Sequence, residues 1–338
     1  MEQYRILVTG GLGTVGSGLI RELMSRGHDV FACDLSHEPN EVGFSLRTDV
    51  AEPRYARADV SEFRQLERVF AKLGPFDYVY HCAAEFGRWN GEDFYELLWR
   101  TNAIGTKNVI RLQEQLGFRL IHFSSSEVYG DWPDIMMESI MDEYEIKQMN
   151  DYAMTKWVNE MQVKNSAAQF GTQTVIVRLF NTYGPGEYYS PYRSVNCRFL
   201  YCALSNLPWT VFQGHARTST FLGDTVCTLA NIVTHFKPGE TYNIGGNNLH
   251  TIEELSDVVV EVTGCDLGLV QYREKEQLTT GAKRVDVSKA IQDLGHQDTY
   301  SLREGMALTS RWMRKVYEFD NGHAVIRGRC RHVPAESV

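Results

Sequence analysis

The chain has 338 residues, of which 43% are hydrophobic and 23% charged, and its formal net charge is −9. This length and apolar fraction fit one large α/β domain with a smaller companion. The negative charge excludes a general attraction to nucleic acid or to an anionic membrane, so a phosphate-bearing ligand would need a local basic pocket.

The first 34 residues predict a βαβ unit. Residues 6–8 form a short apolar run without polar alternation, which is typical of a strand buried on both faces. A glycine turn follows, and then a helix over 17–25 whose apolar residues share one side. A second apolar strand, over 30–33, ends in Asp34.

Three glycines occupy the strand-to-helix turn in the pattern Gly10-x-x-Gly13-x-x-Gly16. They let the backbone turn sharply and approach a pyrophosphate, which the unpaired N–H groups of a helix N-terminus attract. Asp34 stands where a carboxylate can accept both hydroxyls of an adenosine ribose, and it would repel a 2′-phosphate. The pattern therefore favours NAD over NADP, and the alternative is an α/β turn that binds no ligand.

The next elements lead to a loop at the edge of the predicted sheet. A helix over 62–73 separates segment 56–60 from a buried strand over 77–84, which ends in small residues suited to passing under a dinucleotide. The loop after this strand lies where open α/β sheets bind ligands. In this loop, Glu85 and Arg88 either reach a substrate or are solvated loop charges.

The rest of the chain divides by composition. Long helices are predicted over 94–115 and 152–170 and a sixth strand over 175–180, whereas 187–215 is rich in Tyr, Asn, Pro and Arg, as in a substrate-covering region. A strand-to-turn unit at 241–246 and helices over 252–262 and 302–317 follow. We expect an α/β fold with a Rossmann-type, doubly wound parallel sheet in 1–180, with returning segments at about 217–247. We expect a smaller C-terminal substrate-binding domain in 181–216 and 248–318, and a peripheral tail at 319–338.

The candidate chemistry lies on the strand that ends at Ser125 and on the second long helix. Tyr152 and Lys156 are four residues apart on that helix, so both side chains leave the same face. An ammonium beside a phenol stabilises the phenolate, and a nicotinamide cation does so again, so a tyrosine of ordinary pKa about 10 can act as a base near neutral pH. Lys156 can also hold the nicotinamide ribose, and Ser125 would share the proton network. The alternative is a pair of residues on a surface helix.

The glycine turn, the serine-rich strand end and Tyr-x-x-x-Lys together resemble the extended short-chain dehydrogenase/reductase (SDR) superfamily, and within it the nucleotide-sugar epimerases, dehydratases and decarboxylases. The resemblance covers roughly residues 1–318. It implies that NAD stays bound while Tyr152 takes the proton of a sugar 4-hydroxyl and a hydride leaves C4, which gives a 4-keto sugar. It also implies a homodimer in which the two long helices form a four-helix bundle with those of a second copy.

The resemblance assigns further residues. Asp59 would bond the adenine amine, although an N-cap is the alternative. Asn102 would help to shape the active site, Asn181 would bond the substrate diphosphate, Arg217 would bind a phosphate, and Arg284 lies in a late Arg-x-Asp-x-Ser-Lys segment. The expected cofactor-binding residues are Gly10, Gly13, Thr14, Val15, Gly16, Asp34, Asp59, Val60, Ala83, Ala84, Asn102, Tyr152 and Lys156. The expected catalytic residues are Ser125, Ser126, Glu127, Tyr152 and Lys156, and the expected substrate-binding residues are Glu85, Arg88, Ser125, Asn181, Arg193, Arg217 and Arg284.

Ser126 and Glu127 occupy the two positions at which the resembling enzymes differ. Dehydratases have Asp-Glu there, so the missing Asp counts against a standard 4,6-dehydratase. Glu127 is more than a simple 4-epimerase requires, and it indicates proton transfer at C5 or a carboxylate-bearing sugar; the alternative is a strand-end residue bonded to backbone. The Ser-Glu pair fits a uronate decarboxylase, but those enzymes also use an arginine where Lys283 aligns, and Arg284 could replace it only if the backbone shifts.

We therefore expect an NAD-dependent enzyme that oxidises C4 of a nucleotide-diphosphate sugar, with epimerisation as the leading net reaction. Decarboxylation of an NDP-uronate and dehydration of an NDP-hexose are alternatives. A non-catalytic NAD-sensing regulator is a further alternative, but such proteins usually lack the Tyr/Lys pair or the serine. A reductase with exchangeable NADPH is opposed by Asp34 and by the phosphate contacts expected at Asn181 and Arg217.

The seven cysteines are scattered, without CxxC pairs or Cys/His clusters. We therefore expect reduced thiols, no metal and a cytoplasmic protein. The N-terminus enters the first strand directly, which leaves no room for a signal peptide. No apolar run approaches the ~20 residues that span a bilayer, so we expect no membrane attachment.

Overall fold

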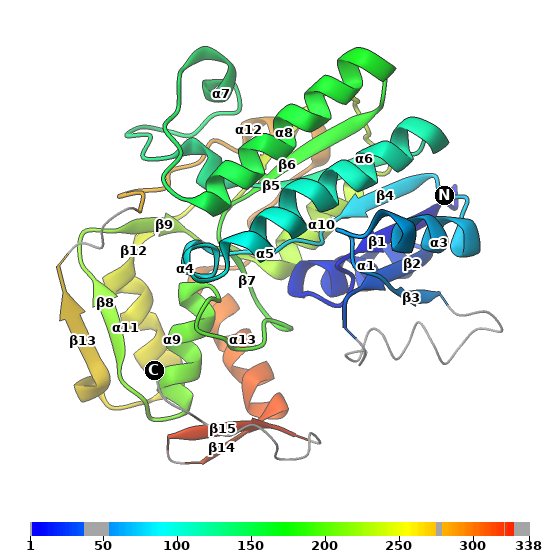
Figure 1. The fold of residues 1–338 in the computed structure, drawn as a ribbon. Coiled ribbons are helices and arrows are strands. Elements are labelled where there is room, and N and C mark those ends of the chain that lie inside the picture. The colour runs from blue at the N-terminus through cyan, green and yellow to red at the C-terminus, as the bar shows by residue number, and fades with distance from the viewer. Residues whose placement is uncertain (1, 37–53, 275–278, 321, 328–338) are drawn as a thin grey trace.

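The computed structural model describes residues 2–36, 54–274, 279–320 and 322–327. Its centre is a parallel sheet of seven strands in the order β11-β6-β5-β4-β1-β2-β3 (Figure 1). These strands are β1 (Arg5–Thr9), β2 (Asp29–Asp34), β3 (Tyr55–Arg57), β4 (Tyr78–His81), β5 (Arg119–Ser125), β6 (Thr174–Leu179) and β11 (Thr241–Ile244). The order reverses between β1 and β4, which is the switch point at which doubly wound sheets bind ligands. The predicted fold class is confirmed.

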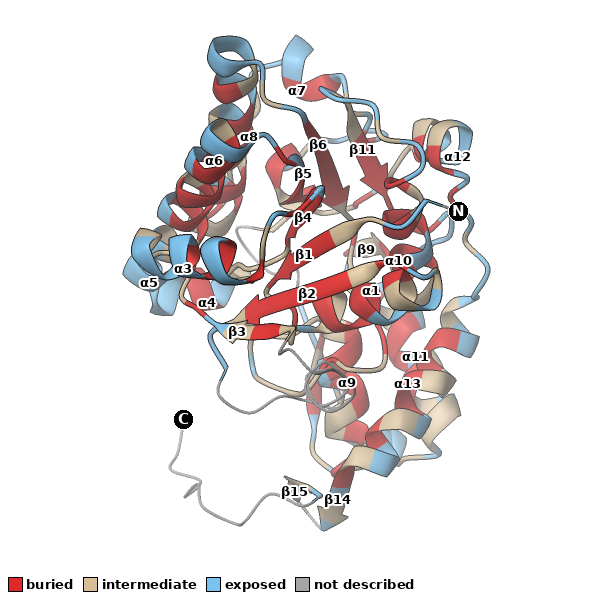
Figure 2. Ribbon diagram, turned by 90° about the vertical axis from the view of Figure 1, so that its right-hand side faces the viewer, coloured by how far each residue is buried: buried red, intermediate tan, exposed pale blue. Residues whose placement is uncertain are grey.

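Two helix layers cover the sheet because successive side chains of a strand point to opposite faces. Ile6 and Val8 pack with α1 (Thr14–Ser25), α10 (Leu222–Asn231) and α12 (Ser288–Leu294). Leu7 packs on the other side with α3 (Phe63–Leu73), α6 (Gly105–Leu116) and α8 (Asp151–Phe170). Both faces are therefore buried, which explains why the strands lack polar alternation (Figure 2).

The helix predicted over 94–115 is interrupted. It consists of α5 (Tyr95–Trp99), a π-helical turn η1 (Arg100–Ile104) and α6. Short π-helical turns often mark functional sites, because the extra residue changes which side chains share a face. Here the turn contains Asn102, which is 1% exposed.

A second hydrophobic core lies apart from the sheet, around Phe199, Leu255 and Met306. Its main helices are α9 (Val195–Leu204), α11 (Ile252–Thr263) and α13 (Leu302–Val316), and β8 (Trp209–Phe212) pairs with β13 (Val270–Arg273) beside them. A hairpin of β14 (Tyr317–Asp320) and β15 (His323–Ile326) packs on this core through Tyr317 and Ile326 (Figure 1). Helix α12, in contrast, packs on the core of the large sheet.

The remaining described elements are short. They are α4 (Arg88–Asp93), η2 (Ser126–Tyr129), α7 (Ile140–Glu143), β7 (Thr182–Tyr183), β9 (Ala216–Thr218), β10 (Thr220–Phe221), β12 (Leu249–Thr251) and η3 (Leu267–Leu269). Strand β7 pairs with β10 and β9 pairs with β12. These short pairs bring segments 181–183 and 216–221 together at the carboxyl end of the sheet.

Candidate active site

A cavity of about 740 Å³ lies at the carboxyl ends of the sheet strands. Residues after β1, β2, β3, β4, β5 and β6 form one wall, and residues 187–194 with Arg198 of α9 form the other. Its volume is in the range of a small-molecule or cofactor site. The large sheet and the second core therefore share one site.

The glycine turn after β1 leaves room for a ligand backbone at the start of α1. Gly10 has φ +65°, and a Cβ there would lie 2.7 Å from Cα of Ala83. A Cβ on Gly16 would collide with the Gly10 carbonyl oxygen. The N-cap of α1 is Gly13, which offers no side-chain cap, so the first N–H groups of the helix are available to an anionic group. This turn fits the pyrophosphate of a dinucleotide.

Asp34 ends β2 at the rim of the same cavity. Its Oδ2 accepts the backbone N–H of Leu12 at 2.9 Å and its Oδ1 accepts that of Ser36 at 3.1 Å. These bonds hold the carboxylate beside the glycine turn, where the sequence predicts the adenosine ribose.

Of the further residues expected to contact the cofactor, six line the cavity and one does not. The six are Thr14, Val15, Asp59, Val60, Ala83 and Ala84. Asp59 also accepts the N–H and hydroxyl of Ser61, at 2.8 and 2.7 Å, so it stabilises the turn before α3 as well. Asn102 is outside the lining: its amide bonds both backbone groups of Glu85, at 2.9 Å each, and Thr155 at 3.0 Å. It therefore holds the loop after β4 against α8.

Tyr152, Lys156 and Ser125 lie next to one another in the lining of the cavity. Ser125 ends β5, and its hydroxyl hydrogen-bonds the Tyr152 phenol. The Lys156 ammonium is 5.8 Å from the centroid of the Tyr152 ring and donates to the carbonyl of Phe123 at 2.8 Å. Two residues from one face of α8 thus adjoin the end of β5, as the four-residue spacing predicts.

Burial dominates the electrostatics of Tyr152 in the protein alone. Burial raises the pKa of Tyr152 to about 12; the Ser125 hydrogen bond lowers it, and the Glu127 charge raises it again. Burial also lowers the pKa of Lys156 to about 8, against the opposing effects of Cys82 and Glu160. In the protein groups alone, desolvation outweighs the other influences on this phenol. The expected lowering of its pKa rests on Lys156 together with a bound nicotinamide cation, and it stays a prediction.

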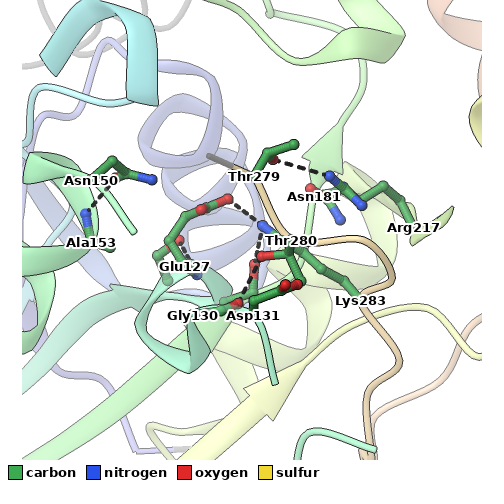
Figure 3. A network of polar contacts seen from close by, with 12 residues as sticks. Glu127, Gly130, Asp131, Asn150, Ala153, Asn181, Arg217, Thr279, Thr280 and Lys283 are labelled. Atoms are coloured by element: carbon green, nitrogen blue, oxygen red, sulfur yellow. Dashed lines mark hydrogen bonds and ion pairs between the residues drawn. The ribbon is translucent and has the colours of Figure 1, made fainter. Parts of the chain in front are cut away.

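Glu127 lines the cavity in the first turn of η2, and its partner is a lysine that we did not include among the expected site residues (Figure 3). Lys283 forms an ion pair with Glu127 Oε1 and donates to Ser126 Oγ at 3.3 Å. The lysine side chain is 2% exposed and that of the glutamate is 24% exposed. The neighbouring Arg284 is exposed, and its carbonyl accepts the N–H of Met136 at 2.8 Å.

Some of the other residues expected to contact the substrate line the cavity and some do not. Glu85, Arg88, Asn181 and Arg193 line the cavity, whereas Arg217 and Arg284 do not. Asn181 adopts φ +41° and donates to the carbonyl of Thr218 at 3.0 Å. The guanidinium of Arg193 lies 4.4 Å from the ring centre of Phe86, across the cavity.

Arg217 does not line the cavity, but its guanidinium points toward Thr279, which does (Figure 3). Its guanidinium donates to the carbonyls of Ala216 and Gly281, at 2.8 and 3.1 Å, and to the hydroxyl of Thr279 at 3.3 Å. Thr279 itself lines the cavity. In this structure the arginine therefore supports the segment that carries Lys283.

Two further charged residues of the cavity wall were missed. Glu187 is 5% exposed and accepts the N–H and hydroxyl of Ser194 at 3.0 and 2.8 Å. Burial raises the pKa of Glu187, although Ser194 and Arg193 act in the opposite direction. Arg198, one turn into α9, also lines the cavity. The sequence offered only a polar and aromatic stretch here, without a pattern that separates wall residues from packing residues.

Within the described residues, no group of three or more His, Cys, Asp or Glu side chains is placed to hold a metal ion. In the same part of the chain, no helix combines the length and the hydropathy needed to cross a membrane.

Known proteins are similar to this chain over most of its length. Residues 6–245 match the family model described as the NAD dependent epimerase/dehydratase family. UDP-glucuronic acid decarboxylase 1 of Xenopus tropicalis is 28% identical over 360 residues, covering 98% of this chain and 79% of that protein. The dTDP-glucose 4,6-dehydratase of Neisseria meningitidis is 29% identical over 347 residues, covering 91% and 92%. Among solved structures, the epimerase Mth375 of Methanothermobacter thermautotrophicus is similar with a TM-score of 0.83 and 26% identity, covering 93% of each chain.

Proposed function

The chain belongs to the NAD dependent epimerase/dehydratase family, whose members are NAD-dependent enzymes, and from this premise we propose that it oxidises C4 of a nucleotide-diphosphate sugar and releases the C4 epimer. The observation that carries the proposal is the Ser125–Tyr152–Lys156 cluster, which faces the same cavity as the glycine turn and Asp34. The similarity to an epimerase at 26% identity supports it.

The residues present fit NAD, because the cradle between Gly10 and Gly16 has no space for side chains and α1 has no side-chain cap. Bound NAD supplies the hydride acceptor and, when oxidised, a positive ring. The phenolate oxygen of Tyr152 receives the proton of the 4-hydroxyl and becomes a phenol, and Ser125 shares that proton through its hydrogen bond to the Tyr152 oxygen. The Lys156 ammonium stabilises the phenolate that Tyr152 must present. Desolvation by the protein raises the pKa of this phenol, and the positive ring of a bound NAD would oppose that rise.

A specific observation favours a second candidate, decarboxylation of an NDP-uronate. Ser126, Glu127 and Lys283 form one charged cluster at the cavity, and a 28% identical relative is a UDP-glucuronic acid decarboxylase. Dehydration is less well supported, although a dTDP-glucose 4,6-dehydratase is also a relative, because Ser126 offers no carboxylic acid to expel a hydroxyl.

One experiment distinguishes epimerisation, decarboxylation and dehydration. The purified protein is incubated in D₂O with UDP-, GDP-, CDP- and dTDP-linked hexoses and uronates, and the products are analysed by mass and NMR. Epimerisation keeps the mass and places no solvent deuterium at C4, because the hydride returns from the cofactor. Decarboxylation loses carbon dioxide and dehydration loses water, and each adds deuterium at carbon. Conversion of no nucleotide sugar would contradict the proposal.

We predict that Tyr152→Phe lowers kcat by about 10²- to 10⁴-fold, because general acid–base catalysis contributes in that range. NAD binding, measured by fluorescence titration, should change little. The matched control is Tyr192→Phe, another cavity tyrosine, whose hydroxyl bonds Asp93 at 2.8 Å. Full activity of the Tyr152→Phe variant would remove the proposed base.

We also propose that the enzyme is a homodimer. Leu97 of α5, Ile104 of η1, and Met154 and Met161 of α8 are 40–53% exposed although they are apolar, and these helices are neighbours in the fold. Such a patch is typical of an interface. Sedimentation velocity should find a dimer for the wild type and for Leu267→Glu, an exposed control site in η3, and a monomer for Ile104→Glu/Met154→Glu. A wild-type monomer would contradict the proposal.

Two further assignments belong to this proposal. Segments 181–216 and 248–318 supply the substrate-binding domain, which the second hydrophobic core supports, with α12 attached to the large sheet. A reducing, cytoplasmic location is supported by the six described cysteines, all of which are free.

A further inference from the structure

We propose that Lys283 is a positioning residue that keeps Glu127 ionised, so that Glu127 serves the substrate as a proton and hydrogen-bond acceptor and not as a proton donor. This inference rests on the proposed function, since it assigns a role to a residue of that site. Its first support is the placement of the pair. Glu127 lines the cavity, whereas Lys283 is 2% exposed and stands behind it, outside the lining (Figure 3).

The position of the ammonium is determined by the backbone that carries it. The Lys283 N–H donates to the carbonyl of Ala216 at 3.1 Å, and the Gly281 N–H donates to Asp131 Oδ1 at 3.0 Å. The hydroxyl of Thr280 donates to the Gly130 carbonyl at 2.7 Å (Figure 3). Segment 280–283 is thus bonded on one side to the turn after η2 and on the other to β9, so the lysine is held against Glu127.

The charges around the pair favour the ionised carboxyl. Burial on its own would raise the pKa of Glu127, but the ammonium of Lys283 lowers it, and Arg217 and Asn150 act in the same direction; the net shift is downward. The other titratable groups that influence the pair are the Tyr152 phenol on α8 and Arg88 of α4. Apart from Glu127 itself and the Tyr152 phenol, these titratable groups are cationic.

A carboxyl group that is held ionised can act as an acceptor but not as a proton donor. It can accept a hydrogen bond from a sugar hydroxyl, or remove a proton from a carbon beside the C4 ketone. It cannot donate the proton that turns a hydroxyl into a leaving water. The Lys283 ammonium also donates a hydrogen bond to the hydroxyl oxygen of Ser126. The hydroxyl proton of Ser126 is therefore directed to an acceptor other than Lys283.

The test compares Lys283→Met with Lys283→Arg, which keeps a permanent charge at the same place. Protonation of Glu127 removes the acceptor, so kcat/KM for a converted nucleotide sugar should fall on the acidic side at the pKa of Glu127. In Lys283→Met this acidic limb should move to higher pH by about 1–3 units, the size of effect expected for losing a neighbouring opposite charge. In Lys283→Arg it should move by much less. An acidic limb at the same pH in the wild type, Lys283→Met and Lys283→Arg would overturn the proposal.

A second readout does not need turnover. The Glu127 carboxyl is followed by ¹³C NMR in protein labelled at glutamate Cδ, with Glu127→Gln to assign the signal. The wild-type signal should titrate below the ordinary value of about 4.3, and the Lys283→Met signal above the wild-type value. Failure to find a substrate would leave this result intact, so the two proposals fail separately. If Lys283→Met does not fold, judged by NAD binding, Lys283→Gln replaces it, and an unshifted Glu127 in either variant overturns the inference.

Discussion

Two ion pairs lie close to the carboxyl end of β5, and they are built differently. Arg178 of β6 binds Glu160 of α8 through two N–H groups, at 2.9 and 2.7 Å, and the two side chains are 1% and 0% exposed. Lys283 binds Glu127 with a single ammonium, and the glutamate is 24% exposed toward the cavity. The comparison indicates that the first pair holds the scaffold, whereas the second leaves one member available for chemistry.

The partners of Arg178–Glu160 support this distinction. Glu160 also accepts the hydroxyl of Ser124 at 2.5 Å, and Arg178 also donates to Tyr129 at 2.8 Å. The network therefore joins β5, β6, η2 and α8, which carry Ser125, Glu127, Tyr152 and Lys156. Because the carboxylate oxygens and guanidinium nitrogens have partners in the protein, the cost of burying both charges is offset and their geometry is fixed.

The largest effect is expected when the first pair is broken. Arg178→Met leaves Glu160 as a buried, unpaired charge, and the free energy of unfolding should fall by about 3–5 kcal/mol. Urea denaturation measures it. The matched control is Lys164→Met, which removes the ion pair of Lys164 with Asp142, whose side chains are 41% and 66% exposed. That change should be below about 1 kcal/mol. Equal effects in the two variants would mean that Arg178–Glu160 does not hold the scaffold.

A smaller effect, dependent on pH, is expected for the second pair. Because the pKa of Glu127 is lowered in the folded state, its stabilisation is present above the unfolded pKa of about 4.3 and is lost as the pH falls through the folded pKa. Near pH 7 the free energy of unfolding should therefore be higher for the wild type than for Lys283→Met. This difference should be smaller than the loss expected for Arg178→Met, because the cavity partly solvates Glu127. The difference should shrink below pH 4.3, as urea denaturation across pH can measure. A difference independent of pH would mean that the lysine acts through packing alone.

The parts of the site that could be predicted from the sequence are those set by local spacing. The glycine turn, Asp34 at the end of a strand, and the four-residue interval from Tyr152 to Lys156 each lie within one βαβ unit or one helix turn, and the structure brings them to one cavity. The family and the fold class followed from the same motifs. Neither the packing around Lys156 nor the burial of Tyr152 can be read from the spacing, so the rise in the Tyr152 pKa that desolvation causes could not be predicted from the sequence.

The contacts that could not be predicted depend on returning segments. Lys283 and Arg284 are neighbours in an extended segment, where successive side chains point to opposite sides, so only one of them can face Glu127. The sequence does not say which, and the structure chooses the lysine. Arg217 likewise lies beside the cavity but bonds Gly281 and Thr279, 62 or more residues further along the chain. For Arg217 and Arg284, a substrate contact stays a prediction.

The π-helical turn at Arg100–Ile104 bears on how this chain should be compared with others. A turn of this kind contains one residue more than an α-helix needs to cover the same rise. Side chains before the turn and side chains after it therefore do not continue one regular face of the helix. Asn102 can then reach the loop at Glu85 while Val109 and Ile110 still face the sheet. Alignments of this helix should therefore treat α5 and α6 as two blocks with a gap allowed between them, or side chains with unrelated positions will be placed in one column.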